Sequence, residues 1–285
     1  TFTIREFARL AAEATDAELA LNAKGELLWQ RAVVGRIAKG GALLKPSAEL
    51  IAGDWLGGDI RQRAEARLKA RVRSWCEDTI RPLLDVSQLE LSPSARAVAY
   101  QLVEAMGCMQ RKDVASFIAQ FTKDDRSAFA GCGVHPGSAL VWIDRLWTPE
   151  AMRARAFMWA MWNEQPVPPP PQGKTLPLGD LPKAAWHAVG YSVLAGRAVR
   201  ADVLEEVVSM LHQTPAPPEV NIARSLGLSQ SDLPVALRVL GYKIERKEGD
   251  TVRYIKRQAK AEEVNKATVL SSEDAAAALR AAWQK

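Results

Sequence analysis

A run of prolines divides this chain into two parts. The stretch "PVPPPPQGKTLPLGDLP" extends from Pro166 to Pro182. Proline lacks a backbone N–H and fixes φ, so such a run cannot continue a helix or enter a central strand. It predicts a stiff polyproline II linker or a surface strap. The expected organisation is an α-rich domain with a small sheet over 1–165, the linker over 166–182, a helical, winged-helix-like domain over 183–257, and a peripheral tail with an Ala-rich helix over 258–285.

The N-terminal part predicts a helix followed by a small antiparallel sheet. Helical spacing continues to about Ala23 and gathers four apolar residues near one face. These are Phe7, Leu10, Ala14 and Leu19. Between residues 25 and 53, short β-branched and apolar runs are interrupted by glycines, which is typical of strands and turns. Trp29 and Val34 are the candidate core positions of this sheet.

A long basic helix is expected from Asp59 to about Leu84. Its buried stripe consists of Ile60, Ala64, Leu68, Val72 and Trp75. A second stripe, Arg63, Arg67 and Arg71, runs along another face at a spacing of four residues. A line of positive charge suits a nucleic-acid backbone. The alternative is a solvated face with partial pairing to Glu65 and Glu77. Pro82 ends or kinks the helix.

Most of the remaining chain predicts further helices. Ser92 is an N-cap with Pro93 at the first helical position, and another helix begins near Thr148. Two short helices are expected between these, and residues 183–213 and 220–240 are predicted to be helical. The signals together predict a mainly α fold with small β elements.

The segment "GYKIERKEGDTVRYIKRQ", Gly241 to Gln258, predicts a hairpin after two short helices. The first of these helices ends at Gly227, and the second begins at an N-cap Ser231. Helix, turn, helix and basic hairpin in this order are typical of a winged helix-turn-helix. A three-residue loop, 248–250, places one set of apolar residues on a single face. That set is Tyr242, Ile244, Val252 and Tyr254.

The other face of this hairpin carries Lys243, Lys247 and Arg253, with Glu245 between them. If the hairpin binds phosphates, these three cations are the contacts, and binding must fall steeply with salt. Arg238 is the main base-reading candidate on the second helix. The alternative is a packing module whose basic face only confers solubility. The net charge of +5 suits a polyanionic partner without requiring one.

No self-contained active site is expected. The stretch "PQGKT" lacks the first glycine of a P-loop, because that position is Pro168. His135, His187 and His212 lie far apart in the sequence, so no metal site is predicted. Cys76, Cys108 and Cys132 are not paired by spacing and predict free, buried thiols in a reducing cytoplasm. No apolar run is long enough to span a membrane.

Five segments, in this order, resemble the C-terminal region of bacterial DExH-box helicases related to the mitochondrial degradosome RNA helicase. They are "GELLWQRAVVGRIAKGGALLKPSAELIA", "SARAVAYQLVEAMG", "MRARAFMWAMW", "LAGRAVRADVLEEV" and "SDLPVALRVLGY". The resemblance implies an accessory region that follows two RecA-like motor domains. ATP, magnesium and the DExH motif would belong to those upstream domains, which this sequence does not contain.

The leading hypothesis from the sequence is a non-catalytic accessory region of an ATP-dependent RNA helicase. It would guide single-stranded RNA beside the motor or dock a partner ribonuclease. The absence of an initial methionine agrees with a segment of a longer protein. Two alternatives remain open at this point: a protein-interaction scaffold and a stand-alone winged-helix regulator that binds duplex DNA.

Overall fold

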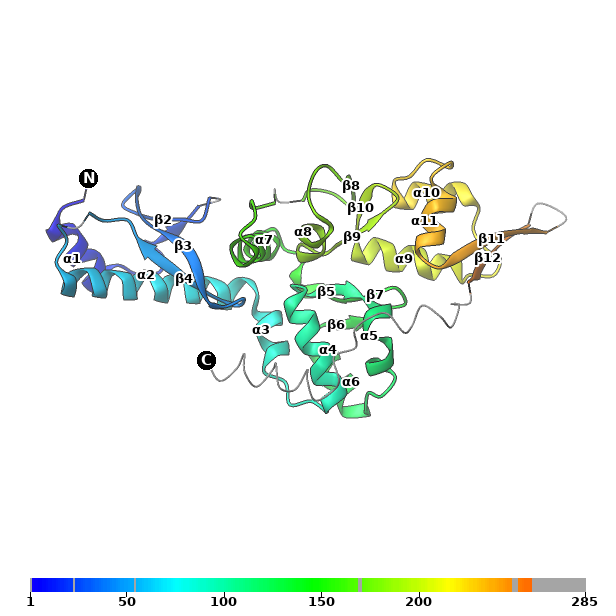
Figure 1. Cartoon of the computed structure of the whole chain (residues 1–285), viewed down its shortest axis with the longest axis horizontal. Helices are drawn as coiled ribbons and strands as arrows, with labels where there is room; N and C mark the ends of the chain where they lie inside the picture. The colour runs from blue at the N-terminus through cyan, green and yellow to red at the C-terminus, as the bar shows by residue number, and fades with distance from the viewer. Residues whose placement is uncertain (1, 23, 54, 169–170, 248–250, 258–285) are drawn as a thin grey trace.

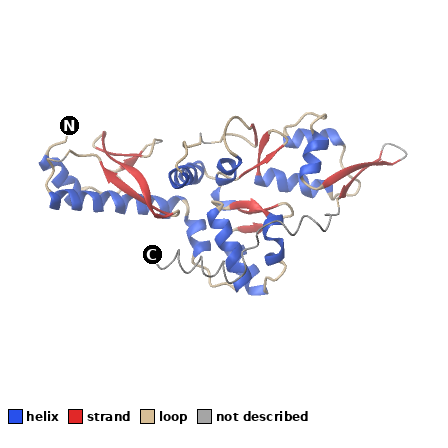
Figure 2. Cartoon of the chain, in the orientation of Figure 1, coloured by secondary structure: helices blue, strands red, loops and turns tan. Residues whose placement is uncertain are grey.

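The computed structural model of the chain describes residues 2–22, 24–53, 55–168, 171–247 and 251–257, with only the backbone described at 246, 247 and 251. Helices and small antiparallel sheets form an elongated molecule (Figures 1 and 2). The sheet of residues 20–50 lies at one end and the hairpin of residues 242–256 lies at the other (Figure 1). The tail with its predicted Ala-rich helix, 258–285, lies outside the described residues. No helix in the described part of the chain is long and apolar enough to cross a membrane.

The N-terminal unit packs two helices against a four-stranded sheet. The first helix ends at Glu13, ten residues before the predicted end near Ala23. Ala14 becomes extended, and Thr15 starts a turn by donating its N–H and hydroxyl to the Glu18 carboxylate. The prediction of a core at Trp29 and Val34 is confirmed, since both are buried. The elements are α1 Ile4–Glu13, β1 Ala20–Leu21, β2 Glu26–Trp29, β3 Ala32–Ala42, β4 Lys45–Leu50 and α2 Gly58–Thr79.

Helix α2 lies directly on the sheet, as its apolar stripe predicts. Ala64, Leu68 and Val72 are fully buried. A Cβ at Gly35 of β3 would lie 2.5 Å from Leu68 Cδ1 and 2.7 Å from the Glu49 carbonyl oxygen, so only glycine permits this approach. The helix ends at Thr79, and Pro82 stands in the first turn of the following helix, as expected.

The central unit surrounds the largest hydrophobic core of the molecule. Ser92 caps its second helix by accepting the Ala95 N–H, and Thr148 caps its last, so both predicted helix starts are confirmed. A small sheet in the order β5-β7-β6 joins the helices. The elements are α3 Arg81–Ser87, α4 Pro93–Glu104, β5 Cys108–Gln110, α5 Arg111–Ile118, α6 Lys123–Gly131, β6 Val134–Pro136, β7 Leu140–Ile143, a 3₁₀ turn Asp144–Leu146 and α7 Pro149–Asn163.

Arg155 of α7 is buried at the centre of this unit, with 1% of its surface exposed. Its Nη1 donates to the Met106 carbonyl (3.1 Å) and its Nη2 to the Leu146 carbonyl (2.6 Å). The guanidinium lies 6.0 Å from the ring centre of Trp147, which Arg200 also approaches, at 5.6 Å. Burial lowers the pKa of Arg155 to about 10. The side chain thus fixes α7 to the end of α4 and to the turn before α7.

The segment after α7 differs from its prediction. Residues 175–177 of the expected linker form an edge strand, β8 Thr175–Pro177, that pairs with β10. The single helical stretch predicted for 183–213 is wrong, because residues 191–200 form a hairpin. Ala195 and Gly196 adopt positive φ (46° and 75°), which makes a tight turn between two short strands. The elements are α8 Lys183–Ala188, β9 Tyr191–Leu194, β10 Arg197–Arg200 and α9 Ala201–Leu211, and the sheet order is β8-β10-β9.

Glu205 of α9 joins this last part of the chain to the central unit. Its carboxylate accepts three consecutive backbone N–H groups from the end of the β6–β7 loop and the first residue of β7, at 2.7, 2.8 and 2.6 Å. Those donors are Ser138, Ala139 and Leu140. Hydrogen bonds to an ionised acceptor are stronger than neutral ones. The loop is therefore held against α9.

The chain ends its described part with two short helices and a hairpin: α10 Glu219–Leu226, α11 Leu233–Val239, β11 Tyr242–Lys247 and β12 Thr251–Lys256. They share one core with α9 and β7. Helices with small antiparallel sheets agree with the predicted fold class in its coarse form. The domain limits predicted from the sequence stay predictions.

Asp125 provides a test of the capping network in the central unit. Burial alone would raise its pKa, but N–H and hydroxyl donors of Ser92 and Thr122 hold it at about 2. Because the folded-state pKa lies below the usual value, the ionised Asp125 carboxylate stabilises the folded state. This stabilisation is complete above about pH 4 and disappears as the pH falls towards 2. We expect Asp125→Asn to lower the free energy of unfolding by roughly 1–3 kcal/mol at pH 7.

Urea unfolding followed by circular dichroism from pH 7 to pH 2 measures this effect. The difference between the two proteins should shrink between about pH 4 and pH 2. A constant difference over that range would contradict the assignment. Asp124, exposed beside Asp125, gives the matched control Asp124→Asn.

Candidate nucleic-acid interface

Two short helices lead into the C-terminal hairpin. Helix α10 ends at Gly227 in the left-handed conformation (φ 63°), as predicted. Helix α11 begins one residue later than expected, with Asp232 rather than Ser231 at the N-cap. The Ser229 hydroxyl causes this difference, because it accepts the Asp232 N–H and donates to the Asp232 carboxylate. Pro234 lies in the first turn of α11, where its missing N–H leaves no unmade bond.

The hairpin has the predicted register. Lys247 pairs with Thr251, so three residues connect the strands, and this connection, 248–250, lies outside the described residues. The apolar face, Tyr242, Ile244, Val252 and Tyr254, packs into the core shared with α9.

Two tyrosine hydroxyls anchor the base of the hairpin. Tyr242 Oη lies 2.8 Å from His212 Nε2, and Tyr254 Oη donates to the Pro217 carbonyl at 3.0 Å. Because β11 is fixed at Tyr242 and β12 at Tyr254, the orientation of the opposite face is also fixed.

That opposite face carries Lys243 and Arg253, both exposed, with Glu245 half-buried between them. Lys247 stands at a position of the same parity on β11, although only its backbone is described. Lys243 and Arg253 thus share one side of the two-stranded ribbon.

A groove of about 480 Å³ separates α11 from β11. Arg238, Lys243 and Arg257 line it together with Pro234, Leu237, Tyr242 and Ile244. The structure therefore brings together Arg238 and Lys243, which the sequence nominated on different elements. Arg257 was not nominated. Arg257 lies four residues after Arg253, so strand alternation places both on the same side. The Arg257 N–H donates to the Gly241 carbonyl at 2.6 Å, which places this residue beside the groove.

The cations of this unit share a second property. Arg224, Arg238, Lys243, Arg253, Lys256 and Arg257 are all exposed. Among the described residues, none of the six has a carboxylate partner within ion-pair distance, in contrast to nine ion pairs of other lysines and arginines. Their positive charge is left available for an external anion.

The arginine stripe of α2 is arranged differently. Arg67 donates to the Ala14 carbonyl and pairs with Asp16 at 2.6 Å, and its side chain is only 19% exposed. Arg71 donates to the Leu19 carbonyl at 2.9 Å. The contact with Arg67 lowers the pKa of Asp16. Arg63 pairs with Asp59 in the preceding turn at 2.6 Å. Two of the three candidates thus fasten residues 14–19 to α2, and α2 lies at the opposite end of the molecule from the hairpin (Figure 1).

The outer face of α11 offers little for reading base edges. Val235 and Val239 are 50% and 62% exposed, and Arg238 is the single described residue of this helix with a base-reading side chain. Contacts from this unit to a nucleic acid would therefore fall mainly on the backbone.

The remaining titratable groups form no catalytic arrangement within the described residues. His135 contacts Asp144 (2.8 Å) and stacks on Trp142, while His187 is half-buried, and burial lowers its pKa. Cys76 and Cys108 are free and buried as predicted, and burial raises the pKa of each thiol to about 12. Cys132 is also free, but it is only half-buried. No group of three or more potential metal ligands occurs in the part of the chain that the structure describes.

Comparison with known proteins found no matching family model, no matching curated protein and no matching solved structure.

Mutation can distinguish Arg67, which binds residues 14 and 16, from Arg63, which pairs within its own helix. We expect Arg67→Ala to lower the free energy of unfolding by about 2–3 kcal/mol, because a half-buried ion pair and a carbonyl hydrogen bond are lost. Arg63→Ala, on the same helix and with an exposed partner, should change it by no more than about 0.5 kcal/mol. Urea titration of the two variants measures both values. Equal changes in the free energy of unfolding would show that Arg67 does not hold residues 14–16 against α2.

Proposed function

We propose that this chain is a non-catalytic, nucleic-acid-binding accessory region of an ATP-dependent RNA helicase, and that it guides single-stranded RNA. In this proposal α9, α10, α11 and the β11–β12 hairpin act as a winged helix, and ATP hydrolysis belongs to motor domains outside this chain. The single observation that carries the binding function is the set of six exposed cations without carboxylate partners in the described residues.

The position of these cations supports a phosphate backbone as the ligand. Arg238, Lys243 and Arg257 converge on one groove from α11, from β11 and from the end of β12. A row of cations separated by a few ångströms can follow successive phosphates, and each contact releases condensed counterions. Arginine also binds phosphate through two parallel N–H donors.

The same geometry supports binding without sequence selectivity. Valine side chains dominate the outer face of α11, so the helix lacks the polar residues that distinguish bases in a major groove. An accessory region that holds any passing strand needs contacts of this kind. The resemblance of five ordered segments to helicase C-terminal regions supports the assignment to RNA and to a motor protein.

Fluorescence anisotropy with a labelled single-stranded RNA over a salt series tests the proposal. We expect the triple variant Arg238→Glu, Lys243→Glu and Arg257→Glu to bind at least about tenfold more weakly at low salt. The slope of log K against log salt should fall by about 2, because each lost phosphate contact removes about 0.7.

The matched control is Arg5→Glu, Lys24→Glu and Lys123→Glu, which changes the net charge equally at exposed positions on other elements. Loss of binding in both triple variants would show a general charge effect and contradict the groove. Tighter binding to a duplex DNA of matched length would instead favour the DNA-binding regulator.

A second candidate function is a protein-interaction scaffold, which the exposed valines of α11 favour. Val235 and Val239 stand four residues apart, so they form one apolar strip on the helix surface. Under this hypothesis Val235→Asp with Val239→Asp would abolish capture of a partner ribonuclease after nuclease treatment in high salt, while the triple glutamate variant retained it. RNA binding lost in the valine variant would argue against a separate protein surface.

A further inference from the structure

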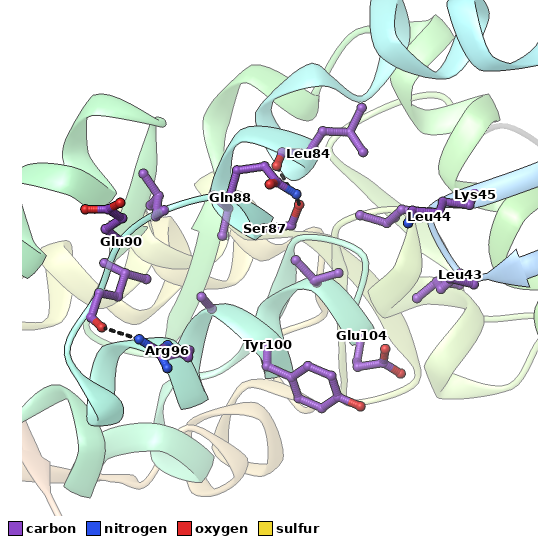
Figure 3. Close-up of a pocket in the computed structure, with 16 residues that line it drawn as sticks. Leu43, Leu44, Lys45, Leu84, Ser87, Gln88, Glu90, Arg96, Tyr100 and Glu104 are labelled. Carbon is purple, nitrogen blue, oxygen red and sulfur yellow. Dashed lines mark hydrogen bonds between the residues drawn. The ribbon is translucent and has the colours of Figure 1, made fainter. Parts of the chain in front are cut away.

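Two grooves of the described structure differ in the charge of their rims. One, of about 860 Å³, lies between the β3–β4 connection, the end of α3 and one face of α4 (Figure 3). Exposed side chains of both signs stand around it, namely Lys45, Glu90, Arg96 and Glu104. Such a rim favours no particular ligand charge. The α11–β11 groove has cations but no acidic residue among the described residues that line it, so it attracts anions.

The α11–β11 groove combines its positive rim with an apolar lining. Pro234 is exposed in the first turn of α11, and Ile244 of β11 is half-buried, so water reaches the apolar surface of both. Leu237 and Tyr242 are almost fully buried and complete the apolar lining. A site for phosphate alone needs only donors and positive charge. The groove therefore has more apolar surface than phosphate binding requires.

Each wall of this groove places a cation next to an apolar side chain. Pro234 and Arg238 are four residues apart on α11, so they lie one turn apart on the same face of that helix. On the opposite wall, Lys243 and Ile244 are neighbours in β11, and both line the groove. Arg257 adds a third cation just after the end of β12. A ligand that fills the groove thus meets charge and apolar surface together.

A nucleotide with an unstacked base has this combination of properties. In a duplex the bases are stacked and paired, so only the backbone would reach the groove. In a single strand a base can turn outward and lie between apolar side chains. The groove volume of about 480 Å³ lies in the range of sites that enclose small organic molecules. Every base has a π-face, so packing against it adds affinity without sequence selectivity.

We propose that the α11–β11 groove holds one unstacked base of a single-stranded RNA between Pro234 and Ile244. The three cations of the rim, Arg238, Lys243 and Arg257, bind the phosphates on either side of that base. This inference rests on the RNA binding proposed for the chain and names the part of the strand that the groove takes. It gives the two apolar side chains a function that phosphate contacts leave unfilled. It also provides a way to distinguish a single strand from a duplex without reading base edges.

Fluorescence anisotropy of the full chain with two labelled strands of equal length tests this base-binding site. One is a single-stranded RNA, and the other is an abasic strand that keeps the sugars and phosphates but lacks the bases. We expect the native chain to bind the RNA at least about fivefold more tightly. The salt dependence of binding should be the same for both strands, because their phosphate contacts are the same.

A double variant tests the two apolar walls. Pro234→Ser with Ile244→Thr removes the apolar contact and leaves the three cations in place. Its affinity for the RNA should fall at least about fivefold, to the affinity for the abasic strand, which should not change. The matched control is Val235→Ser with Val252→Thr, an exposed residue of α11 and a half-buried residue of the hairpin outside the groove lining. This control should keep the native preference for the RNA.

Equal binding of the two strands by the native chain would overturn the base-binding site and leave the phosphate contacts standing. A preference for the RNA that persists in the Pro234 and Ile244 variant would also overturn it. Binding of neither strand by the native chain would instead contradict the proposed function itself. Pro234→Ser alone, at an exposed position, should already reduce the preference, so the test does not depend on the packing of Ile244.

Discussion

The buried guanidinium of Arg155 is the interaction on which the central part of this molecule depends. A charged group without a carboxylate partner is expensive to bury, and the buried Nε of Arg155 has no hydrogen-bond partner among the described residues. Here two main-chain carbonyls and the face of Trp147 surround it. The carbonyls come from Met106, after α4, and from Leu146, before α7. One side chain thereby fixes the relative positions of two helices, and the adjacent Arg200 extends the same contact to β10.

Much of the helical framework could be predicted from the sequence because its signals are local. Ser92 and Thr148 precede prolines at helix starts, and each of these two hydroxyls accepts the expected N–H. The stripe of Ala64, Leu68 and Val72 has a period that only one face of a helix satisfies. The hairpin register was also predictable, because a one-residue slip would move Tyr242 and Tyr254 to the opposite faces of their strands and mix apolar with charged residues.

The features that were missed depend only in part on contacts between distant residues. The β9–β10 hairpin, for example, gains a third strand from Thr175–Pro177, in a segment whose prolines predict an irregular linker. The early end of α1 reflects a local turn that Thr15 and Glu18 make, and Arg67 binds the Asp16 carboxylate of this turn from 51 residues away.

The candidate site, too, was predictable only in part from the sequence. The sequence identified Lys243 and Arg253 from strand parity and Arg238 from its helix. It could not separate an arginine that pairs within its own helix from those that bind residues 14–19, because Arg63, Arg67 and Arg71 have identical spacing. Only the positions of Asp16 and Leu19 distinguish them.

The Glu205 carboxylate has a mechanical consequence. If a single-stranded nucleic acid bound in the α11–β11 groove were pulled, the force would act on the hairpin. Tyr242 would transmit this force to His212 at the end of α9. Helix α9 is in turn held by three N–H groups, two from the β6–β7 loop and one from the start of β7, that donate to Glu205. Tension at the hairpin would thus reach the small sheet of the central unit through a short series of polar contacts.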